Sequence, residues 1–296
     1  MTKIDATEQS GEEALRHPAR EARAEAEKGS GWYAWLARTG LVAKGISFGI
    51  VGVLAIKLAL GDGGKATSRQ GAMQALSHNS FGKVLLIVLA FGFAAYAIWR
   101  FVQAFAERGD DDGEAKTWAK RAGYLGRGLI YAGLTFTTIK ILTGSGGQES
   151  QNQKAHKTTA AILGWPGGRW IVGLAGLCIV GAGLWNAYRG VTKKFEDRWR
   201  TGRMSKTERK WGSRAGVLGH LARAVVFTLV GIFITKAAVD YDAKEAIGID
   251  GALQKLVNQS YGPWLLGVTA AGLLAYGVFC LVDARYRDVS TGAAQS

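Results

Sequence analysis

The sequence predicts an all-α, polytopic integral membrane protein with six transmembrane helices, arranged as three tandem two-helix hairpin repeats. Three observations predict this fold: six long segments almost free of charge, connections of alternating basicity, and an internal repeat. An apolar segment of about twenty residues matches the thickness of the hydrocarbon core of a bilayer. The segments are apolar on all sides, whereas the helices of a soluble bundle would carry a polar stripe. They are expected at 39–60, 82–105, 122–143, 168–190, 215–239 and 262–284.

The chain before the first apolar segment is rich in charge. A segment with so little to bury predicts a disordered tail over residues 1–35. This tail lacks the apolar centre of a cleavable signal peptide, so we expect the first apolar segment to remain in the protein as an anchor.

Lys and Arg are distributed unevenly among the connections. Residues 1–38, 106–121, 190–214 and 285–296 together carry 21 of them. Residues 61–81, 144–169 and 240–261 together carry seven. Because cytoplasmic connections are enriched in Lys and Arg, we expect both chain ends, including a short tail at 286–296, to lie in the cytoplasm.

The first helix of each hairpin is repeated along the chain. The stretches "GLVAKGISFGIVGVLAIK" (40–57), "GYLGRGLIYAGLTFTTIK" (123–140) and "GHLARAVVFTLVGIFITK" (219–236) align without gaps. The second helices repeat as well, since "QGAMQALSHNSFG" (70–82) matches "DGALQKLVNQSYG" (250–262). We therefore expect hairpin repeats at 36–105, 119–190 and 213–285, with a basic loop at 191–212 and a short amphipathic segment inside each hairpin.

Three features of the sequence carry a resemblance to a known family. They are the Gly-x-x-x-[Lys/Arg] helix starts and the stretches "GWPGGRWIVGLAGLCIVGAGLWNAYRGVTKKF" and "ARAVVFTLVGIFITKAAV". The chain resembles a bacterial membrane-protein family called domain of unknown function 1206, whose unit is a pair of transmembrane helices that occurs three times. The resemblance covers about residues 35–285. It implies the three-hairpin arrangement and a bacterial inner (plasma) membrane, and it implies no particular activity.

Small residues recur on one face of each first helix and predict close helix packing, because they let two backbones approach in lipid. This small face consists of Gly45, Gly49, Gly52, Gly128, Ala132, Thr135, Ala224, Thr228 and Gly231. The structural interpretation accounts for these residues without a ligand.

Basic residues recur near both ends of the same three helices. The inner ring is Lys44, Arg127 and Arg223, and the outer ring is Lys57, Lys140 and Lys236. Each ring has two interpretations: side chains that reach the interface and anchor the helix, or a positive constriction that attracts anions. Thirteen residues separate the rings on each helix, which places them about 140° apart around the helix axis. At most one ring can therefore line a central pathway.

The loop at 190–214 carries nine Lys and Arg and three acids, interleaved with aromatic residues. Each basic residue near an anionic membrane surface contributes about 1 kcal/mol of binding. We expect this loop to bind anionic lipid headgroups, and we expect no nucleic acid partner. The residues proposed for this contact are Lys193, Lys194, Arg198, Arg200 and Arg203.

No catalytic, cofactor-binding or metal-binding motif is found in the sequence. "GDGGKAT" (61–67) lacks the glycine spacing and the preceding strand of a phosphate-binding loop. The apolar segments contain no Asp or Glu at mid-membrane, which disfavours proton-coupled and cation-coupled transport. We expect a non-enzymatic structural protein that binds lipid or a membrane-protein partner. The alternative is a channel or transporter for a small solute or anion along a pseudo-threefold axis.

Overall fold

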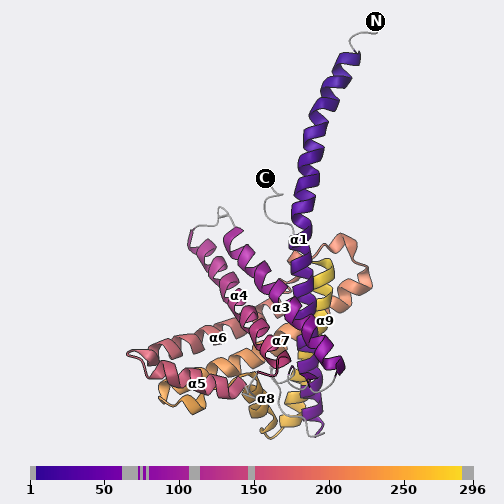
Figure 1. The fold of residues 1–296 in the computed structure, drawn as a ribbon. Coiled ribbons are helices and arrows are strands. Elements are labelled where there is room, and N and C mark those ends of the chain that lie inside the picture. The colour runs from indigo at the N-terminus through magenta and orange to yellow at the C-terminus, as the bar shows by residue number, and fades with distance from the viewer. Residues whose placement is uncertain are drawn as a thin grey trace.

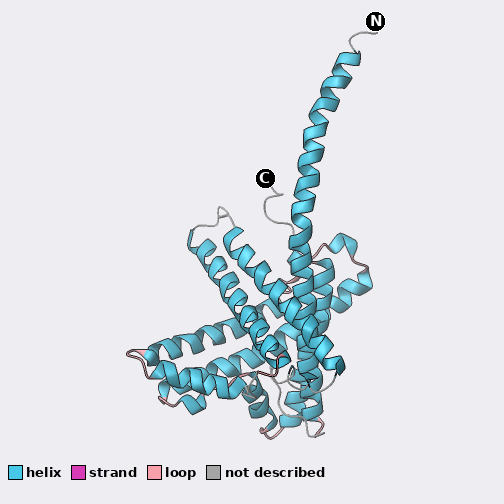
Figure 2. Cartoon of the chain, in the orientation of Figure 1, coloured by secondary structure: helices cyan, strands magenta, loops and turns pink. Residues whose placement is uncertain are grey.

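The computed structural model describes residues 5–61, 73, 76–77, 80–106, 114–145 and 151–288, without the side chains of 5–30, 106 and 114–116. Every regular element in these parts is a helix, as Figure 2 shows. The long helices are α1 (Asp5–Ala59), α3 (Ser80–Ala106), α4 (Glu114–Leu142), α6 (Gly168–Val191), α7 (Lys206–Val239) and α9 (Gly262–Tyr286). The short elements are α5 (Gln151–Leu163), η1 (Glu196–Arg198), η2 (Thr201–Arg203), η3 (Ala243–Glu245) and α8 (Ile249–Val257).

Six long helices thus cover the six predicted segments, but five of them are apolar and long enough to cross a membrane. These five are Gly31–Ala59 within α1, Ser80–Phe105 within α3, α6, α7 and α9. Five of the six predicted spans are thus candidate spans by length and composition, and α4 is the exception among the described helices. Its central stretch contains four glycines, two tyrosines, three threonines and Arg127, which lower its hydropathy below that of the other helices.

α1 begins at Asp5, inside the segment for which the sequence predicts disorder. Ala, Glu and Arg make up much of this segment, and all three favour a helical backbone. Figure 1 shows this part of α1 extending away from the other helices.

The small face of each first helix packs on a helix of another repeat. A Cβ atom at Gly45 of α1 would meet the carbonyl oxygen of Gly277 of α9 at 2.9 Å. A Cβ atom at Gly128 of α4 would meet the ring of Phe101 of α3 at 2.8 Å, and one at Gly231 of α7 would meet the backbone nitrogen of Val180 of α6 at 2.6 Å. The predicted close packing is therefore present, and it joins α1 to α9, α4 to α3 and α7 to α6.

The remaining small-face residues take part in the same three contacts or lie beside them. Gly52 approaches the backbone of Leu274, and Thr228 approaches Gly183. Open space surrounds the Cβ position of Gly49, although Gly277 packs against its backbone. Ala224 is buried, while Ala132 and Thr135 are half-buried.

Short helices cover the end of the bundle opposite to the start of α1 (Figure 1). Asn152 of α5 accepts a hydrogen bond at Oδ1 from the backbone N–H of Gly248, at 2.7 Å, just before α8. The backbone N–H of Asn152 donates to Asp250 at 3.3 Å, and the hydroxyl of Tyr241 donates to the carbonyl of Leu163 at 2.6 Å. These bonds join the connections of the second and third repeats to each other.

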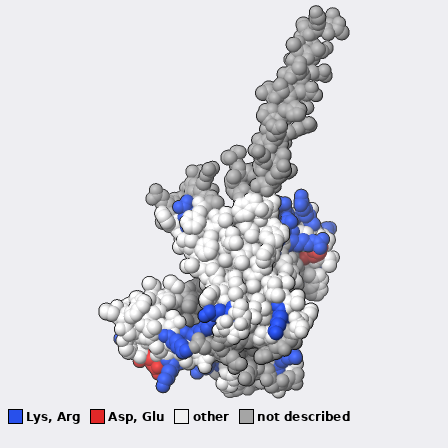
Figure 3. Space-filling model, viewed as in Figure 1, with Lys and Arg blue, Asp and Glu red and all other residues white. Residues whose placement is uncertain are grey.

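Apolar side chains dominate much of the surface. Trp170, Trp264 and Val268 are each more than 70% exposed. Figure 3 shows a broad area without charge between groups of Lys and Arg. Such an area is typical of a protein surface in contact with lipid.

Candidate functional site

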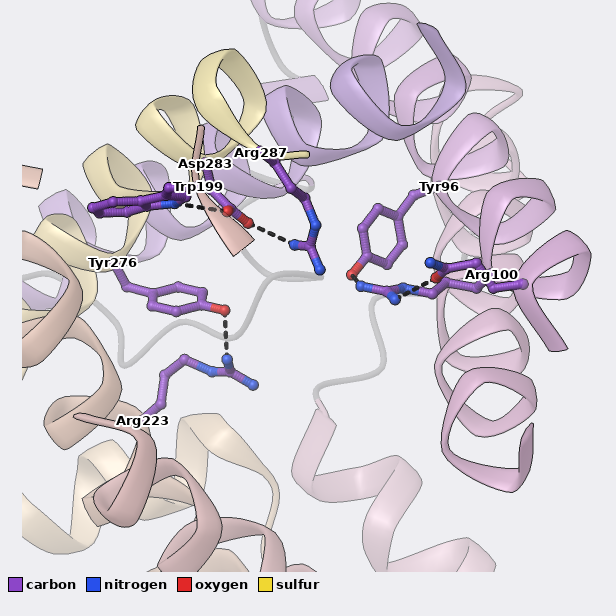
Figure 4. Close-up of polar contacts among 8 residues, drawn as sticks. Tyr96, Arg100, Trp199, Arg223, Tyr276, Asp283 and Arg287 are labelled. Carbon is purple, nitrogen blue, oxygen red and sulfur yellow. Dashed lines mark hydrogen bonds and ion pairs between the residues drawn. The ribbon is translucent and has the colours of Figure 1, made fainter. Parts of the chain in front are cut away.

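Two tyrosines at equivalent positions of α3 and α9 hold three basic side chains together. The Nζ atom of Lys44 lies 5.7 Å from the ring centre of Tyr96 and 5.1 Å from that of Tyr276. Arg100 donates to the hydroxyl of Tyr96 at 2.6 Å, and Arg223 donates to the hydroxyl of Tyr276 at 2.6 Å. Figure 4 shows that these two arginine–tyrosine pairs lie on opposite sides of a shared central region.

Four more arginines approach the same region. Arg287, just after α9, reaches toward Tyr96 and lies 5.3 Å from the ring centre of Trp99. Arg127, Arg189 and Arg198 lie within electrostatic range of these side chains, although Arg127 and Arg198 are exposed and Arg189 is half-buried. We call the seven residues the basic cluster: Lys44, Arg100, Arg127, Arg189, Arg198, Arg223 and Arg287.

Among the described residues, Asp283 of α9 is the acidic side chain that contacts the basic cluster directly. It accepts from Arg287 at 2.7 Å and from the indole N–H of Trp199 at 3.1 Å (Figure 4). Asp283, Arg287 and Trp199 are all buried. One carboxylate therefore compensates a small part of the positive charge of the basic cluster.

Hydrogen-bond donors exceed acceptors in the basic cluster. The Nε atoms of Arg100 and Arg223 are buried, and neither has a hydrogen-bond partner in the described part of the chain. A buried donor without a partner costs stability, and an anion with several oxygens would remove that cost. The basic cluster therefore has the chemistry of a site for a polyoxygen anion such as a phosphate group.

Two members of the basic cluster outside the long helices show opposite effects of their surroundings. Partial removal from water, together with repulsion by Arg287 and Arg189, lowers the pKa of Arg198 to about 10. Burial is the largest single effect on Arg287 and disfavours its charge, but the attraction of Asp283, Tyr96 and Tyr276 and the hydrogen bond to Asp283 together exceed it and raise the pKa of Arg287. Both guanidinium groups stay positively charged at neutral pH.

The inner ring is part of the basic cluster, whereas the outer ring lies apart from it. Lys57, Lys140 and Lys236 are all exposed. Lys236 forms an ion pair with Asp240 at 3.4 Å and another with Glu245 at 2.8 Å. Glu245 is the last residue of η3, a short turn that the repeat pattern does not predict.

The basic loop folds back onto the bundle. Phe195 and Trp199 are buried in it. Its backbone joins the end of α9 through hydrogen bonds from Arg200 to Tyr286 and from Asp288 to Arg198, each at 2.8 Å. This burial explains why the loop contains aromatic residues, which pack against α7 and α9.

The five loop residues proposed for headgroup contact divide into three groups. Lys193, Lys194 and Arg203 are exposed, and the Nζ atom of Lys194 lies 4.9 Å from the ring centre of Tyr188. Arg200 pairs with Asp288 at 2.8 Å, and Arg198, which is also exposed, belongs to the basic cluster.

The sequence pattern does not single out Arg100, Arg189 or Arg287 as site residues. Arg100 and Arg189 occupy equivalent positions, each directly after an aromatic residue, Trp99 and Tyr188 respectively, so the repeat itself contains a signal for them. Arg287 has no equivalent basic residue in the other repeats. Its place in the basic cluster depends on how α9 ends.

Two polar residues of the long helices bond within their own helices. His220 of α7 is buried, lies 2.7 Å from the carbonyl oxygen of Gly216 through Nδ1, and stacks on Phe195 with ring centres 5.1 Å apart. Asn186 donates to the carbonyl of Ala182 one turn earlier in α6.

Sequence comparisons agree with the repeat. The family described as "Domain of Unknown Function (DUF1206)" matches at residues 39–107, 122–193 and 218–287. "Uncharacterized protein YxxB" of Bacillus subtilis is 28% identical over 259 residues, which cover 88% of this chain and 93% of that protein. No solved structure matches the chain.

Proposed function

The chain belongs to the family Domain of Unknown Function (DUF1206), and from that premise we propose that it is a non-enzymatic membrane protein that binds anionic lipid headgroups. One observation carries the proposal: seven basic side chains converge at one end of the bundle with Asp283 as their acidic contact. The ligand is the phosphate group of a membrane lipid. The binding site is the basic cluster, supplemented by the exposed lysines of the basic loop.

The location of the basic cluster along the helices supports a lipid ligand. Lys44 lies thirteen residues before Lys57, so the two are about 20 Å apart along α1. The cluster is therefore close to one face of the bilayer, near the depth of lipid phosphates. The excess of basic residues in 190–214 supports placing this face on the cytoplasmic side of a bacterial inner membrane.

Arginine chemistry also supports a phosphate ligand. A guanidinium group can donate two parallel hydrogen bonds to phosphate oxygens, and six of the seven residues in the basic cluster are arginines. Each basic group near anionic lipid contributes about 1 kcal/mol. Removing two of them should weaken binding by about 2 kcal/mol, or roughly thirtyfold.

Lipid binding by the purified protein tests the proposal. Lipid-depleted protein is mixed with phosphatidylglycerol or phosphatidylcholine in mild detergent, and the bound lipids are counted by native mass spectrometry. We expect selective binding of phosphatidylglycerol, and a roughly thirtyfold loss of affinity in the Lys44→Gln/Arg223→Gln variant. The matched control is Lys57→Gln/Lys140→Gln, which removes the same charge from the exposed outer ring.

Equal loss in the two variants would show that net charge, and not the basic cluster, attracts the lipid. The alternative function, an anion pathway along the pseudo-threefold axis, would use the same inner-ring residues. It predicts anion flux in proteoliposomes that falls in Lys44→Gln/Arg223→Gln. A membrane-protein partner remains a further prediction, tested by what co-purifies in mild detergent.

A further inference from the structure

The six long helices contact one another in a single series, α4–α3–α1–α9–α7–α6, which would form a ring if its two ends met. α1 packs against both α3 and α9, α7 packs against both α6 and α9, and α4 packs against α3. Closing this ring requires a contact between α4 and α6, the two helices of the second repeat. Among the described residues, these two helices do not pack along each other as the helices of the first and third repeats do. We call the interval between α4 and α6 the seam.

Glycines at equivalent positions show that the second repeat has small residues like the other two repeats, but that its two helices are arranged differently. In the first repeat, a Cβ atom at Gly92 would collide with Ala43. In the third repeat, a Cβ atom at Gly272 would collide with Ala222. The corresponding residues of the second repeat are Gly126 and Gly181, and neither has a neighbouring atom within 4 Å of its Cβ position.

A second equivalent pair is also separated. Gly40 packs on Tyr96 in the first repeat, and Gly219 packs on Tyr276 in the third. Their counterparts are Gly123, whose Cβ position is open, and Trp185, whose side chain is 54% exposed. The second repeat thus keeps the small residues of a packed hairpin while leaving their surfaces uncovered.

The seam leads to the basic cluster. Arg127 directly follows Gly126 on α4, and Arg189 lies one helical turn after Trp185 on α6. Arg189 is among the charged groups within electrostatic range of Arg127, and neither side chain is fully buried: Arg127 is exposed and Arg189 is half-buried. In Figure 4, Arg100 and Arg223, which occupy equivalent positions in the other repeats, point toward the same central region.

We propose that the seam holds one anionic phospholipid, with its phosphate between Arg127 and Arg189 and its acyl chains along α4 and α6. This inference rests on the proposed function. It adds that the ligand is a whole phospholipid, and that its acyl chains lie along α4 and α6. A soluble anion would leave the apolar surface of the seam uncovered. A second copy of the chain would bring like charges together at Arg127 and Arg189, whereas a phosphate neutralises them.

Filling the seam tests the proposal without changing any charge. Gly126→Trp and Gly181→Trp place a large side chain where the structure has open space, so both variants should fold. Val268→Trp is the matched control, because Val268 is 73% exposed on α9 and lies outside the seam. Binding of dioleoyl phosphatidylglycerol is measured by native mass spectrometry, and binding of soluble glycerol 3-phosphate by calorimetry.

We expect both seam variants to lose about tenfold or more in affinity for the phospholipid, which corresponds to at least 1.4 kcal/mol. Their affinity for glycerol 3-phosphate should equal that of the wild type and of Val268→Trp. Wild-type phospholipid affinity in both seam variants would overturn the seam proposal but leave the proposed function standing. Failure of the wild-type protein to bind either probe would overturn both. Conversion of a wild-type dimer to a monomer by the seam variants would assign the seam to a second copy and overturn the proposal.

Two further measurements keep the test independent of folding defects. Gel filtration and circular dichroism verify that each variant is folded before binding is measured. In addition, a Gly181→Cys variant can be folded first and then modified with a bulky thiol reagent, in a Cys178→Ala background. The same loss of phospholipid binding is expected after modification, and unchanged binding would count against the seam.

Discussion

The contact between α6 and α7 yields a quantitative prediction from two glycines of the same helix. A Cβ atom at Gly176 would collide with the hydroxyl of Thr235 and would lie 2.7 Å from its backbone nitrogen. It would also lie 3.0 Å from the carbonyl oxygen of Gly231. Thr235 cannot easily move aside, because its hydroxyl donates to Gly231 at 2.9 Å. A Cβ atom at Gly181, five residues later in α6, would have no neighbouring atom within 4 Å.

Both glycines lie inside α6, so replacing either with alanine should gain about 1 kcal/mol of helix propensity. Overpacking at a tight contact costs about 1–3 kcal/mol. Gly181→Ala should therefore be more stable than Gly176→Ala by about 1–3 kcal/mol, since the propensity gain is common to both variants.

Unfolding by sodium dodecyl sulfate in mixed micelles, followed by circular dichroism, measures this difference. The unfolding midpoint of Gly176→Ala should fall below that of Gly181→Ala, which should equal or exceed the wild-type midpoint. Equal midpoints for the two variants would refute the close approach of α6 and α7 and, with it, the arrangement of the helix series.

Three further predictions concern single side chains. Asp283→Asn should destabilise the protein by about 3–5 kcal/mol in the same unfolding assay, because it leaves the charge of Arg287 buried without its partner. Adding Arg287→Gln to this variant should restore part of the lost stability. Wild-type stability of Asp283→Asn alone would contradict the ion pair. Lys236→Gln should change stability by less than about 1 kcal/mol, because its two ion pairs are exposed; a larger loss would indicate a buried role. In the folded, detergent-solubilised protein, Cys178 should react with a maleimide and Cys280 should not, because Cys178 is exposed and Cys280 is buried. Mass spectrometry measures the labelling, and equal labelling of the two cysteines would contradict the burial of Cys280.

The helices and the repeat are well predicted from the sequence, because they depend on local composition. The end of α9 lies two residues from its predicted position, and α6 begins at the predicted Gly168. Several small-face residues, such as Gly45, Gly52 and Gly231, lie at close helix contacts. The partners of these residues are not predicted, because an apolar helix in lipid has no sequence signal that distinguishes a neighbour in its own repeat from one in another.

The basic cluster is predicted in part for a similar reason. The inner ring follows from alignment of the repeats, since Lys44, Arg127 and Arg223 occupy one position in three copies. Arg198 and Arg287 join them through tertiary contacts between the basic loop and the end of α9. Phe195 and Trp199 make those contacts by burying aromatic rings, which the sequence alone presents as typical of an interfacial loop.

The repeat is a unit of sequence but not an independent unit of packing. The first helix of each repeat buries its small face against the second helix of another repeat, so α1 of the first repeat depends on α9 of the third. A chain that ends before Gly262 would therefore leave Gly45 and Gly52 without their partners Gly277 and Leu274. We expect this truncated chain to be degraded in membranes, and a separately expressed α9 segment to restore its level, as immunoblotting would measure. Stable accumulation of the truncated chain without α9 would mean that each hairpin folds independently, contrary to the exchange of helices between repeats.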